Sequence, residues 1–462
     1  MIPKSSNPVN LTWAAIIAVL LSSIFTCAQA QRAFNDAGEA ESLFVPPGAE
    51  DPSSGIAPTT DVPHINEFFQ NIATNGNGRT CETCHLENQG WSILTDRLQA
   101  LFDAKGGDTP GSVGEEAIFR PIDAATKPTA QVATREQRLQ AYGLLLERGV
   151  IRIALQVPSN SEFAVEMVDS PAGFDKFDPT AALPVLSLFR RPLPTTNLKF
   201  VTVVNWDGRN APRQLSAPVR AIPDGLKNQA NGATRNHAQS DQNFPLTDPV
   251  RTSIADFEAR LFTAQTVHWQ AGPLDANGAL GGPFNLAAGT LENRDGFHLF
   301  DAWTGLPGAQ GDIADGQRIF NSKRFTVNLP DGRGRVRGSC ATCHNNPNVG
   351  NSRSTDPSFF YDVGISAANR RSSDVPLITL RRIGSEETLR TTDPGRGLIS
   401  GRWADLNRFK VPSLRGLASH PPYFHDGSAE TIAGVVDHYK NFFGIDLSGG
   451  ERENLIKFLE SL

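Results

Sequence analysis

Residues 81–85 read Cys-Glu-Thr-Cys-His, and residues 340–344 read Cys-Ala-Thr-Cys-His. Each stretch has two cysteines separated by two residues, and a histidine follows the second cysteine directly. This is the attachment pattern of haem c, in which each thiol adds to a vinyl group of the porphyrin and the histidine binds the iron. Because the pattern occurs twice, the sequence predicts two covalently attached haem groups.

Paired cysteines also occur in Cys₄ zinc sites, in disulfides and in redox-active Cys-x-x-Cys motifs. None of these sites needs a histidine directly after both pairs. The chain has five cysteines, and Cys27 lies in an N-terminal segment that we expect to be removed, so the two motifs account for all the others. The haem interpretation assigns attachment to Cys81, Cys84, Cys340 and Cys343, and iron binding to His85 and His344.

The composition of the 462 residues is typical of a soluble globular protein, with 39% hydrophobic and 20% charged residues and a net charge of −6. A mildly acidic chain without a basic stripe does not suit nucleic-acid binding. Neither a phosphate-binding loop nor a Gly-x-Ser-x-Gly elbow is present. The 41 glycines and 32 prolines favour short helices joined by irregular chain.

Residues 1–30 resemble a secretory signal. Lys4 precedes an uncharged, mostly apolar stretch at 11–27, and Ala-Gln-Ala at 28–30 fits the small-x-small cleavage pattern. The alternative is a membrane anchor, because 17 apolar-leaning residues approach spanning length. We expect cleavage after Ala30, which predicts a periplasmic protein that does not span a membrane.

The expected fold is mainly α, with two cytochrome c-like haem domains, long irregular loops and a small β-hairpin insertion. The predicted boundaries are a signal peptide at 1–30, a flexible leader at 31–62, an N-terminal haem domain at 63–300 and a C-terminal haem domain at 301–462.

Local patterns support these elements. Thr134 and Gln137 fit a helix capping box, and residues 253–265, 312–320 and 451–462 have helical apolar spacing. Apolar residues alternate at 151–157 and again at 163–167, with Pro-Ser-Asn between them. We therefore predict that these two strands form the hairpin.

The chain is poor in residues that could fill the sixth coordination position of the irons. Its methionines are Met1 and Met167, so the C-terminal haem has no methionine in its own region. No histidine lies between His85 and His237, and only His64 lies just upstream. Since His/Met ligation is usual for electron-transfer haems, we expect an open position at the N-terminal iron. An open iron binds peroxide or oxygen, which points to catalysis.

Three further segments extend the pattern: Trp-Asp-Gly-Arg at 206–209, Phe-Lys-Val-Pro-Ser-Leu-Arg-Gly at 409–416, and Pro-Tyr-Phe-His-Asp-Gly-Ser at 422–428, followed by Val-Val-Asp-His-Tyr at 435–439. Together with the two haem motifs, they resemble the bacterial di-haem cytochrome c peroxidase family, which includes MauG-type enzymes. The landmarks follow the family's order from about residue 64 to the C-terminus. A single segment would be weak, whereas the ordered set is specific.

The resemblance implies roles for five residues. Trp206 matches the tryptophan between the two haems, and Gln214 and Asp224 match the distal glutamine and glutamate at the N-terminal haem. Asp224 departs from the family, because aspartate is one methylene shorter. Tyr439 matches the sixth ligand of the C-terminal haem, where peroxidases have methionine and MauG-type enzymes have tyrosine. His438 is the alternative ligand. The family also often carries a calcium ion between the domains.

We therefore predict a periplasmic di-haem oxidoreductase that reduces hydrogen peroxide at the N-terminal haem, with electrons relayed through the C-terminal haem. A small redox protein would supply the electrons, or a protein substrate would be oxidised as in MauG. The alternatives are a non-catalytic electron-transfer cytochrome and a haem-dependent oxygenase.

Overall fold

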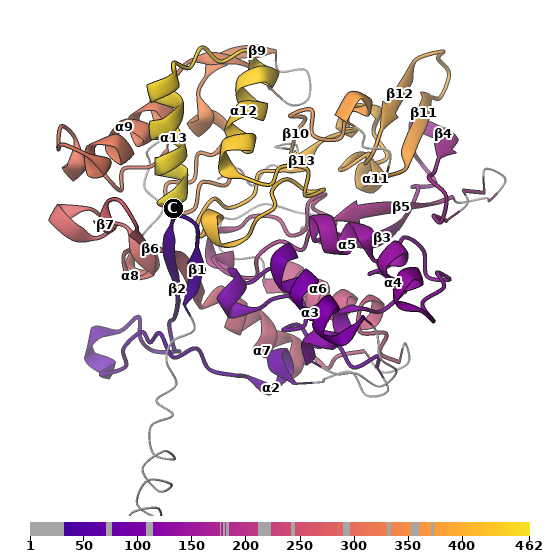
Figure 1. Cartoon of the computed structure of the whole chain (residues 1–462), viewed down its shortest axis with the longest axis horizontal. Coiled ribbons are helices and arrows are strands. Elements are labelled where there is room, and N and C mark those ends of the chain that lie inside the picture. Colours follow the sequence, from indigo (N-terminus) through magenta and orange to yellow (C-terminus); the bar gives the residue numbers. More distant parts are fainter. Residues whose placement is uncertain are drawn as a thin grey trace, which may run out of the picture.

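The computed structural model describes residues 32–70, 76–107, 114–175, 177–178, 181, 184–210, 223–241, 245–289, 296–329, 334–352, 360–370 and 374–462 (Figure 1). Its α-helices are α2 (Asn66–Phe69), α3 (Thr95–Lys105), α4 (Arg135–Ala141), α5 (Gly143–Arg148), α6 (Pro223–Asn236), α7 (Asp248–Ala259), α8 (Gly282–Ala288), α9 (Ala309–Ser322), α10 (Cys340–Cys343), α11 (Gly397–Ser400), α12 (Ile432–Phe443) and α13 (Gly449–Glu460). Its strands are β1 (Ala33–Asn35), β2 (Gly38–Phe44), β3 (Ile151–Gln156), β4 (Phe163–Asp169), β5 (Val185–Arg190), β6 (Leu261–His268), β7 (Gly272–Pro273), β8 (Phe325–Asn328), β9 (Arg335–Gly338), β10 (Phe360–Tyr361), β11 (Leu377–Arg382), β12 (Thr388–Thr391) and β13 (Phe409–Lys410).

Helices α2, α6 and α7 pack around the first haem motif. Phe68 of α2 is fully buried, and its ring lies 5.0 Å from that of Phe257 on α7 and 6.0 Å from that of Trp91. Cys81 packs against this aromatic cluster. The apolar side chains of α2 and α7 thus form the core that supports the first motif.

A second core surrounds α10 and the second motif. Helix α13 packs along α9 in the yellow and orange part of Figure 1. Phe458 of α13 is fully buried, with its ring 5.4 Å from that of Phe320 on α9 and 5.7 Å from that of Phe297. The helices that we predicted at 253–265, 312–320 and 451–462 correspond to α7, α9 and α13, although α7 ends at Ala259 and residues 261–265 belong to β6.

The expectation of a mainly α fold is only partly right. The described residues contain thirteen strands, which form five small sheets of two to four strands. Most strands are short and pair locally, such as β8 with β9. A periodicity analysis misses such strands, because two to four residues contain too little alternation of apolar and polar side chains to detect.

The predicted hairpin is wrong, although both of its strands exist. Strand β3 pairs with β5, and β4 pairs with β11, more than 200 residues away in the sequence. Figure 1 shows β4 in purple beside the orange β11 and β12. The alternation of apolar residues identified both strands correctly. It contains no information about which distant strand each one pairs with, and this pairing determines the sheet.

The leader is also different from the prediction in part of its length. Within 31–62, strands β1 and β2 form a sheet with β6, and Ala40 and Leu43 are fully buried. Ser42 of β2 accepts a hydrogen bond of 2.8 Å from Nε1 of Trp91. This segment therefore belongs to the core beside the first motif.

The capping box at Thr134 is confirmed, since its side chain accepts from the backbone N–H of Gln137. The predicted signal peptide falls on residues outside those that the structure describes. Within the described part of the chain, no helix has the length and apolar character needed to cross a membrane. The boundary between the two haem domains at residue 300 stays a prediction.

A buried ion network joins segments from both halves of the chain. Arg190, at the end of β5, contacts Asp207 and Asp393, and its Nε lies 2.6 Å from Oδ2 of Asp393. All three side chains are at most 3% exposed. The two carboxylates hold the pKa of Arg190 above its ordinary value and offset the cost of its burial. The network fixes the Trp-Asp-Gly-Arg segment against the C-terminal half.

We predict that Arg190→Met lowers the thermal unfolding midpoint, because it removes the counterion that two buried carboxylates share and leaves Asp207 with Arg209 alone. Breaking a buried ion pair costs about 3–5 kcal/mol. Arg381→Met is the matched control, since Arg381 pairs with Glu166 at the surface, where an ion pair contributes about 0–1 kcal/mol. Calorimetry of both variants tests this, and equal midpoints for the two variants would contradict the assigned role of the network.

Candidate functional site

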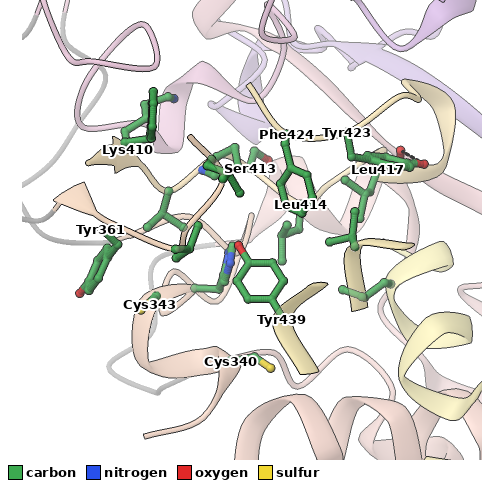
Figure 2. A pocket seen from close by; sticks show the side chains of 18 of the residues that line it. Cys340, Cys343, Tyr361, Lys410, Ser413, Leu414, Leu417, Tyr423, Phe424 and Tyr439 are labelled. Carbon is green, nitrogen blue, oxygen red and sulfur yellow. Dashed lines mark hydrogen bonds between the residues drawn. The ribbon is translucent and has the colours of Figure 1, made fainter. Parts of the chain in front are cut away.

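Two cavities contain the two cysteine motifs. The N-terminal cavity is lined by Cys81, Cys84 and His85 and encloses about 1320 Å³, counting solvent at its mouth. The C-terminal cavity is lined by the corresponding residues of the second motif, and it encloses about 1730 Å³ on the same count. Its lining is dominated by apolar side chains, some of which are drawn in Figure 2. Spaces of this size and character suit a large flat cofactor.

Each motif forms a single helical turn that brings its cysteines to one side. The amide of His344 donates to the carbonyl of Cys340 at 3.0 Å, and Ser339 and Thr342 cap this turn reciprocally. The four thiols are free rather than joined in disulfides. Desolvation raises the pKa of Cys81 and of Cys340 to about 12. Reactive redox cysteines have a lowered thiol pKa instead, so this environment does not favour a redox-active Cys-x-x-Cys site.

Both motif histidines are oriented for iron through their outer ring nitrogen. Nδ1 of His85 lies 2.9 Å from the carbonyl of Trp91, and Nδ1 of His344 lies 2.5 Å from that of Gly350. Such a bond fixes the tautomer and leaves Nε2 with its lone pair for a metal. Burial lowers the pKa of each imidazole to about 4, so both rings are neutral.

The backbone conformation of Gly350 places its carbonyl beside Nδ1 of His344. Its φ of +67° lies in the left-handed region that glycine adopts without strain, and an added Cβ would come within 2.7 Å of the Phe297 ring. A side chain at this position would therefore displace either the carbonyl that orients His344 or the aromatic core below it.

Three buried cations line the C-terminal cavity without an acidic partner among the described residues: Arg191, Lys410 and Arg415. The guanidinium of Arg191 donates only to backbone carbonyls, including that of Ile93 at 2.8 Å. Nη1 of Arg415 has no hydrogen-bond partner in the described part of the chain. An unpaired buried charge costs several kcal/mol. Haem carries two propionate carboxylates, so these cations fit a haem better than they fit an empty protein cavity.

Desolvation acts on all three cations. It lowers the pKa of Lys410 to about 8, and it lowers the pKa of both arginines. The arginines stay charged because their ordinary pKa exceeds ~12. The ammonium of Lys410 would regain its ordinary pKa beside a carboxylate.

Trp206 lies in the wall that the two cavities share. It lines both of them, together with Lys410 and the segment from Arg191 to Pro194. Nε1 of Trp206 donates to the carbonyl of Arg191 at 2.9 Å, and the carbonyl of Trp206 accepts from the amide of Lys410 at 2.9 Å. Two hydrogen bonds therefore hold the indole in a fixed position between the motifs.

The three segments quoted from the sequence meet at this wall. The ring of His425 lies 4.3 Å from that of Phe409 and 6.3 Å from that of Trp206. The carbonyl of His425 accepts from the amide of Arg191 at 2.7 Å. His425 is fully buried, and it lines neither cavity. Its position makes it a support for the wall.

Tyr439 faces the C-terminal cavity, whereas His438 faces elsewhere. Figure 2 shows the Tyr439 ring projecting into the space between Cys343, Leu414 and Phe424. No described residue hydrogen-bonds with the Tyr439 hydroxyl. Burial raises the pKa of this phenol. The ring nitrogens of His438 contact the Arg370 guanidinium and, at 2.8 Å, the carbonyl of Val363.

The predicted distal pair is not assembled in the described residues. Gln214 lies outside them. Asp224 is exposed in the first turn of α6 and does not line the N-terminal cavity. Met167 is 52% exposed on β4, and neither it nor His64 lines a cavity.

Helix α6 instead presents one face to the N-terminal cavity, and His237 directly after the helix continues it. The lining residues on the helix are Leu226, Gln229, Ala230, Ala233 and Thr234. His237 ends this face, and its Nδ1 lies 2.7 Å from Oδ2 of Asp123, which also accepts from Arg79 at 2.7 Å. Sequence analysis assigned no role to His237. Its spacing of three and four residues from small side chains on α6 was a signal that we missed.

A second residue missed by sequence analysis is Glu258 of α7. It lines the N-terminal cavity, is 3% exposed and has no hydrogen-bond partner for its Oε2 among the described residues. Within the same part of the chain, no group of three or more His, Cys, Asp or Glu side chains could hold a metal ion. The possible calcium ion therefore stays a prediction.

The chain is similar to several known proteins, although no family model matches it. Cytochrome-c peroxidase IdrP2 of Denitromonas iodatirespirans is 33% identical over 32% of this chain and 38% of its own length. The methylamine utilization protein MauG of Methylorubrum extorquens is 27% identical over 60% of this chain and 65% of its own length. Cytochrome c551 peroxidase of Nitrosomonas europaea is 29% identical over 29% of this chain and 33% of its own length.

The chain thus spans between 33% and 65% of the length of these relatives. A crystal structure of a MauG-like protein associated with microbial copper homeostasis aligns over 59% of this chain and 73% of that chain, with 16% identity and a TM-score of 0.32. Two of these relatives are cytochrome c peroxidases by name and the third is MauG, and their matches confirm the resemblance drawn from the motifs. The chain is a relative of the di-haem cytochrome c peroxidases and MauG.

Proposed function

We propose that the chain is a periplasmic oxidoreductase carrying two covalently bound haem c groups. The thioether bonds would form at Cys81 and Cys84 in the N-terminal cavity and at the corresponding pair in the C-terminal cavity. The free thiols, the neutral imidazoles of His85 and His344 and the unpaired buried cations all support this assignment.

We propose further that hydrogen peroxide is reduced in the N-terminal cavity with electrons that reach it from the C-terminal cavity. The bound haem supplies the redox chemistry, as in other haem enzymes. One observation carries the proposal: Trp206 belongs to the walls of both cavities. An indole is polarisable and oxidisable, so it shortens the path of an electron between two porphyrins. Its two hydrogen bonds keep that path constant.

Tyr439 lines the C-terminal cavity and not the N-terminal one, and this difference supports electron transfer from the C-terminal to the N-terminal cavity. Tyr439 faces the C-terminal cavity with a free hydroxyl, and no methionine lines either cavity. A phenolate ligand stabilises the ferric and higher states of iron, and the positive charge of the iron would offset the raised pKa of Tyr439. This is the MauG-like arrangement, in which a protein substrate is oxidised at the surface. A small redox protein as electron donor is the peroxidase-like arrangement.

A non-catalytic electron carrier is the second candidate, and one observation favours it. His237 lines the N-terminal cavity with its Nε2 unbonded to any described residue. An imidazole at the sixth position would give a saturated low-spin iron and remove the open site. Its Nδ1 contact with Asp123 would orient such a ligand as well as it would orient a proton-transferring imidazole.

The proposed attachment predicts that both haems stay on the polypeptide after denaturation. Intact-protein mass spectrometry of the exported wild-type chain should show the added mass of two haems. Cys340→Ser with Cys343→Ser should retain only the N-terminal haem. A mass without added haem in wild type would contradict covalent attachment.

The proposed reaction predicts that stoichiometric peroxide promptly removes a high-spin band from the optical spectrum of the ferric protein, and that a reductant restores it. Trp206→Phe should slow the restoration about tenfold or more, which corresponds to ~1.4 kcal/mol in the barrier. Stopped-flow spectroscopy measures both steps. A spectrum that is low-spin at the start and insensitive to peroxide would instead favour the electron carrier.

The proposed ligation predicts that Tyr439→Phe changes the spectrum of the C-terminal haem by removing its sixth ligand. His438→Gln is the matched control, because His438 is adjacent on α12 but contacts Arg370 and Val363. Electron paramagnetic resonance of both ferric variants distinguishes them. A C-terminal signal altered in the His438 variant alone would assign the ligand to His438.

A further inference from the structure

Glu258 is a buried acid with no hydrogen-bond partner for its Oε2 among the described residues. It lies on the inner face of α7, next to Phe257 and four residues after Ile254, both of which are buried. The helix therefore carries Glu258 into the interior on an otherwise apolar face. Its side chain reaches the N-terminal cavity near Cys81, and its Oε2 has no hydrogen-bond partner among the described residues.

Burial without a partner keeps this acid neutral. Desolvation raises the pKa of Glu258 to about 8, because an isolated carboxylate is poorly stabilised in the interior. Glu258 therefore carries a proton at neutral pH. An apolar residue would fill this helix position at a lower free-energy cost, so the carboxyl group calls for a functional explanation.

No ionisable group around Glu258 pairs with it among the described residues. The ionisable side chains of the same cavity are Arg79, Cys81, Cys84, His85, Arg190, Arg191, Arg209, His237 and Lys410. On the elements packed against α7, Glu67 of α2 contacts Ser253, and Lys227 of α6 pairs with Asp248. Lys199 lies over the ring of Phe262. None of these groups forms an ion pair with Glu258.

Peroxide reduction requires protons inside this cavity. The overall reaction takes up two electrons and two protons, breaks the O–O bond and forms two waters. The family position for the proton-transferring acid is Asp224, which is exposed and outside the lining. Two other polar groups of the lining suit this role less well. His237 is held by Asp123. Lys410 lies in the wall shared with the C-terminal cavity, where a haem propionate would neutralise its charge. Glu258 is the acid that the described lining supplies.

We propose that Glu258 is the proton donor of the N-terminal cavity. Its carboxyl group gives a proton to a peroxide oxygen as the O–O bond breaks, and it then takes up another proton from solvent. The two electrons come from the redox donor of the proposed function, on which this inference rests. One of the two protons of each turnover passes through Glu258, and the other comes directly from water.

The pH dependence follows from the protonated form being the active one. A group whose pKa is raised on folding holds its proton below that pKa and loses it above. The rate of the peroxide reaction should therefore be constant below about pH 8 and fall above it. Glu258→Gln keeps the shape of the side chain but cannot release a proton, so its slow residual rate should not show this fall.

Glu87→Gln is the matched control. Glu87 is 9% exposed, desolvation raises its pKa to about 8, and its Oε1 has no partner among the described residues. It lies two residues after His85, yet it does not line the N-terminal cavity. The control therefore removes a similar buried acid close to the motif without changing the cavity wall.

The experiment measures the rate of the peroxide reaction by stopped flow from pH 6 to 10 in haem-loaded wild type, Glu258→Gln, Glu258→Asp and Glu87→Gln. General acid catalysis contributes about 10²–10⁴-fold, so Glu258→Gln should slow the reaction about a hundredfold or more. Glu258→Asp should recover part of the rate, and Glu87→Gln should match wild type. Haem content and the ferric spectrum establish that each variant is folded.

Infrared difference spectroscopy gives a readout independent of turnover. Wild type and Glu258→Gln both keep Glu87, so subtracting their spectra isolates the neutral carboxylic acid band of Glu258. This band should titrate with the pH of the rate, and it should persist in Glu87→Gln. A Glu258→Gln rate equal to wild type would overturn this inference and leave the proposed function intact. A wild-type protein inert to peroxide at every pH would overturn the proposed function and this inference with it.

Discussion

The burial of positive charge in the wall between the two cavities is the constraint on which the rest of the structure depends. Arg190 is neutralised within the protein by Asp207 and Asp393, which come from opposite halves of the chain. Neighbouring Arg191 has no carboxylate among the described residues and donates only to carbonyls. These two consecutive arginines thus have different roles. Arg190 joins two segments of the chain, whereas the charge of Arg191 is available to an anionic ligand. The position of Trp206 follows, because Arg191 accepts its indole N–H.

Much of the site could be predicted from sequence, because its chemistry lies in short local motifs. The two cysteine motifs fix a helical turn, two thiols and a histidine without help from distant residues. Trp206 and Tyr439 were found through ordered segments, and the structure brings both to the cavities. The contact between these segments could not be predicted from the sequence, since the rings of Phe409, His425 and Trp206 come from parts of the chain some 200 residues apart.

Pairing partners and burial were the features that sequence could not provide. The alternation at 163–167 predicted a strand, but its partner β11 follows it by more than 200 residues. The polar leader at 31–62 was expected to be flexible, yet its apolar residues fill the core beside Trp91. Glu258 is preceded by Phe257 in a helix that any periodicity analysis would find, but a single glutamate on that helix reads as a solvent-facing residue until α2 and α6 are placed over it.

His237 and Glu258, the two residues that sequence analysis missed, differ in how firmly their surroundings hold them. Arg79 fixes Asp123, the hydrogen-bond partner of His237, so the network keeps the imidazole in one orientation. Oε2 of Glu258 has no hydrogen-bond partner in the part of the chain that the structure describes, and desolvation raises the pKa of its carboxyl group. An imidazole held this firmly suits a ligand or a hydrogen-bond donor, which should not change orientation during turnover. A carboxyl group without partners suits proton transfer, which requires that the group exist in both states. The N-terminal cavity therefore contains His237, whose orientation is fixed, and Glu258, whose environment suits proton exchange. A simple electron carrier would not require such a pair.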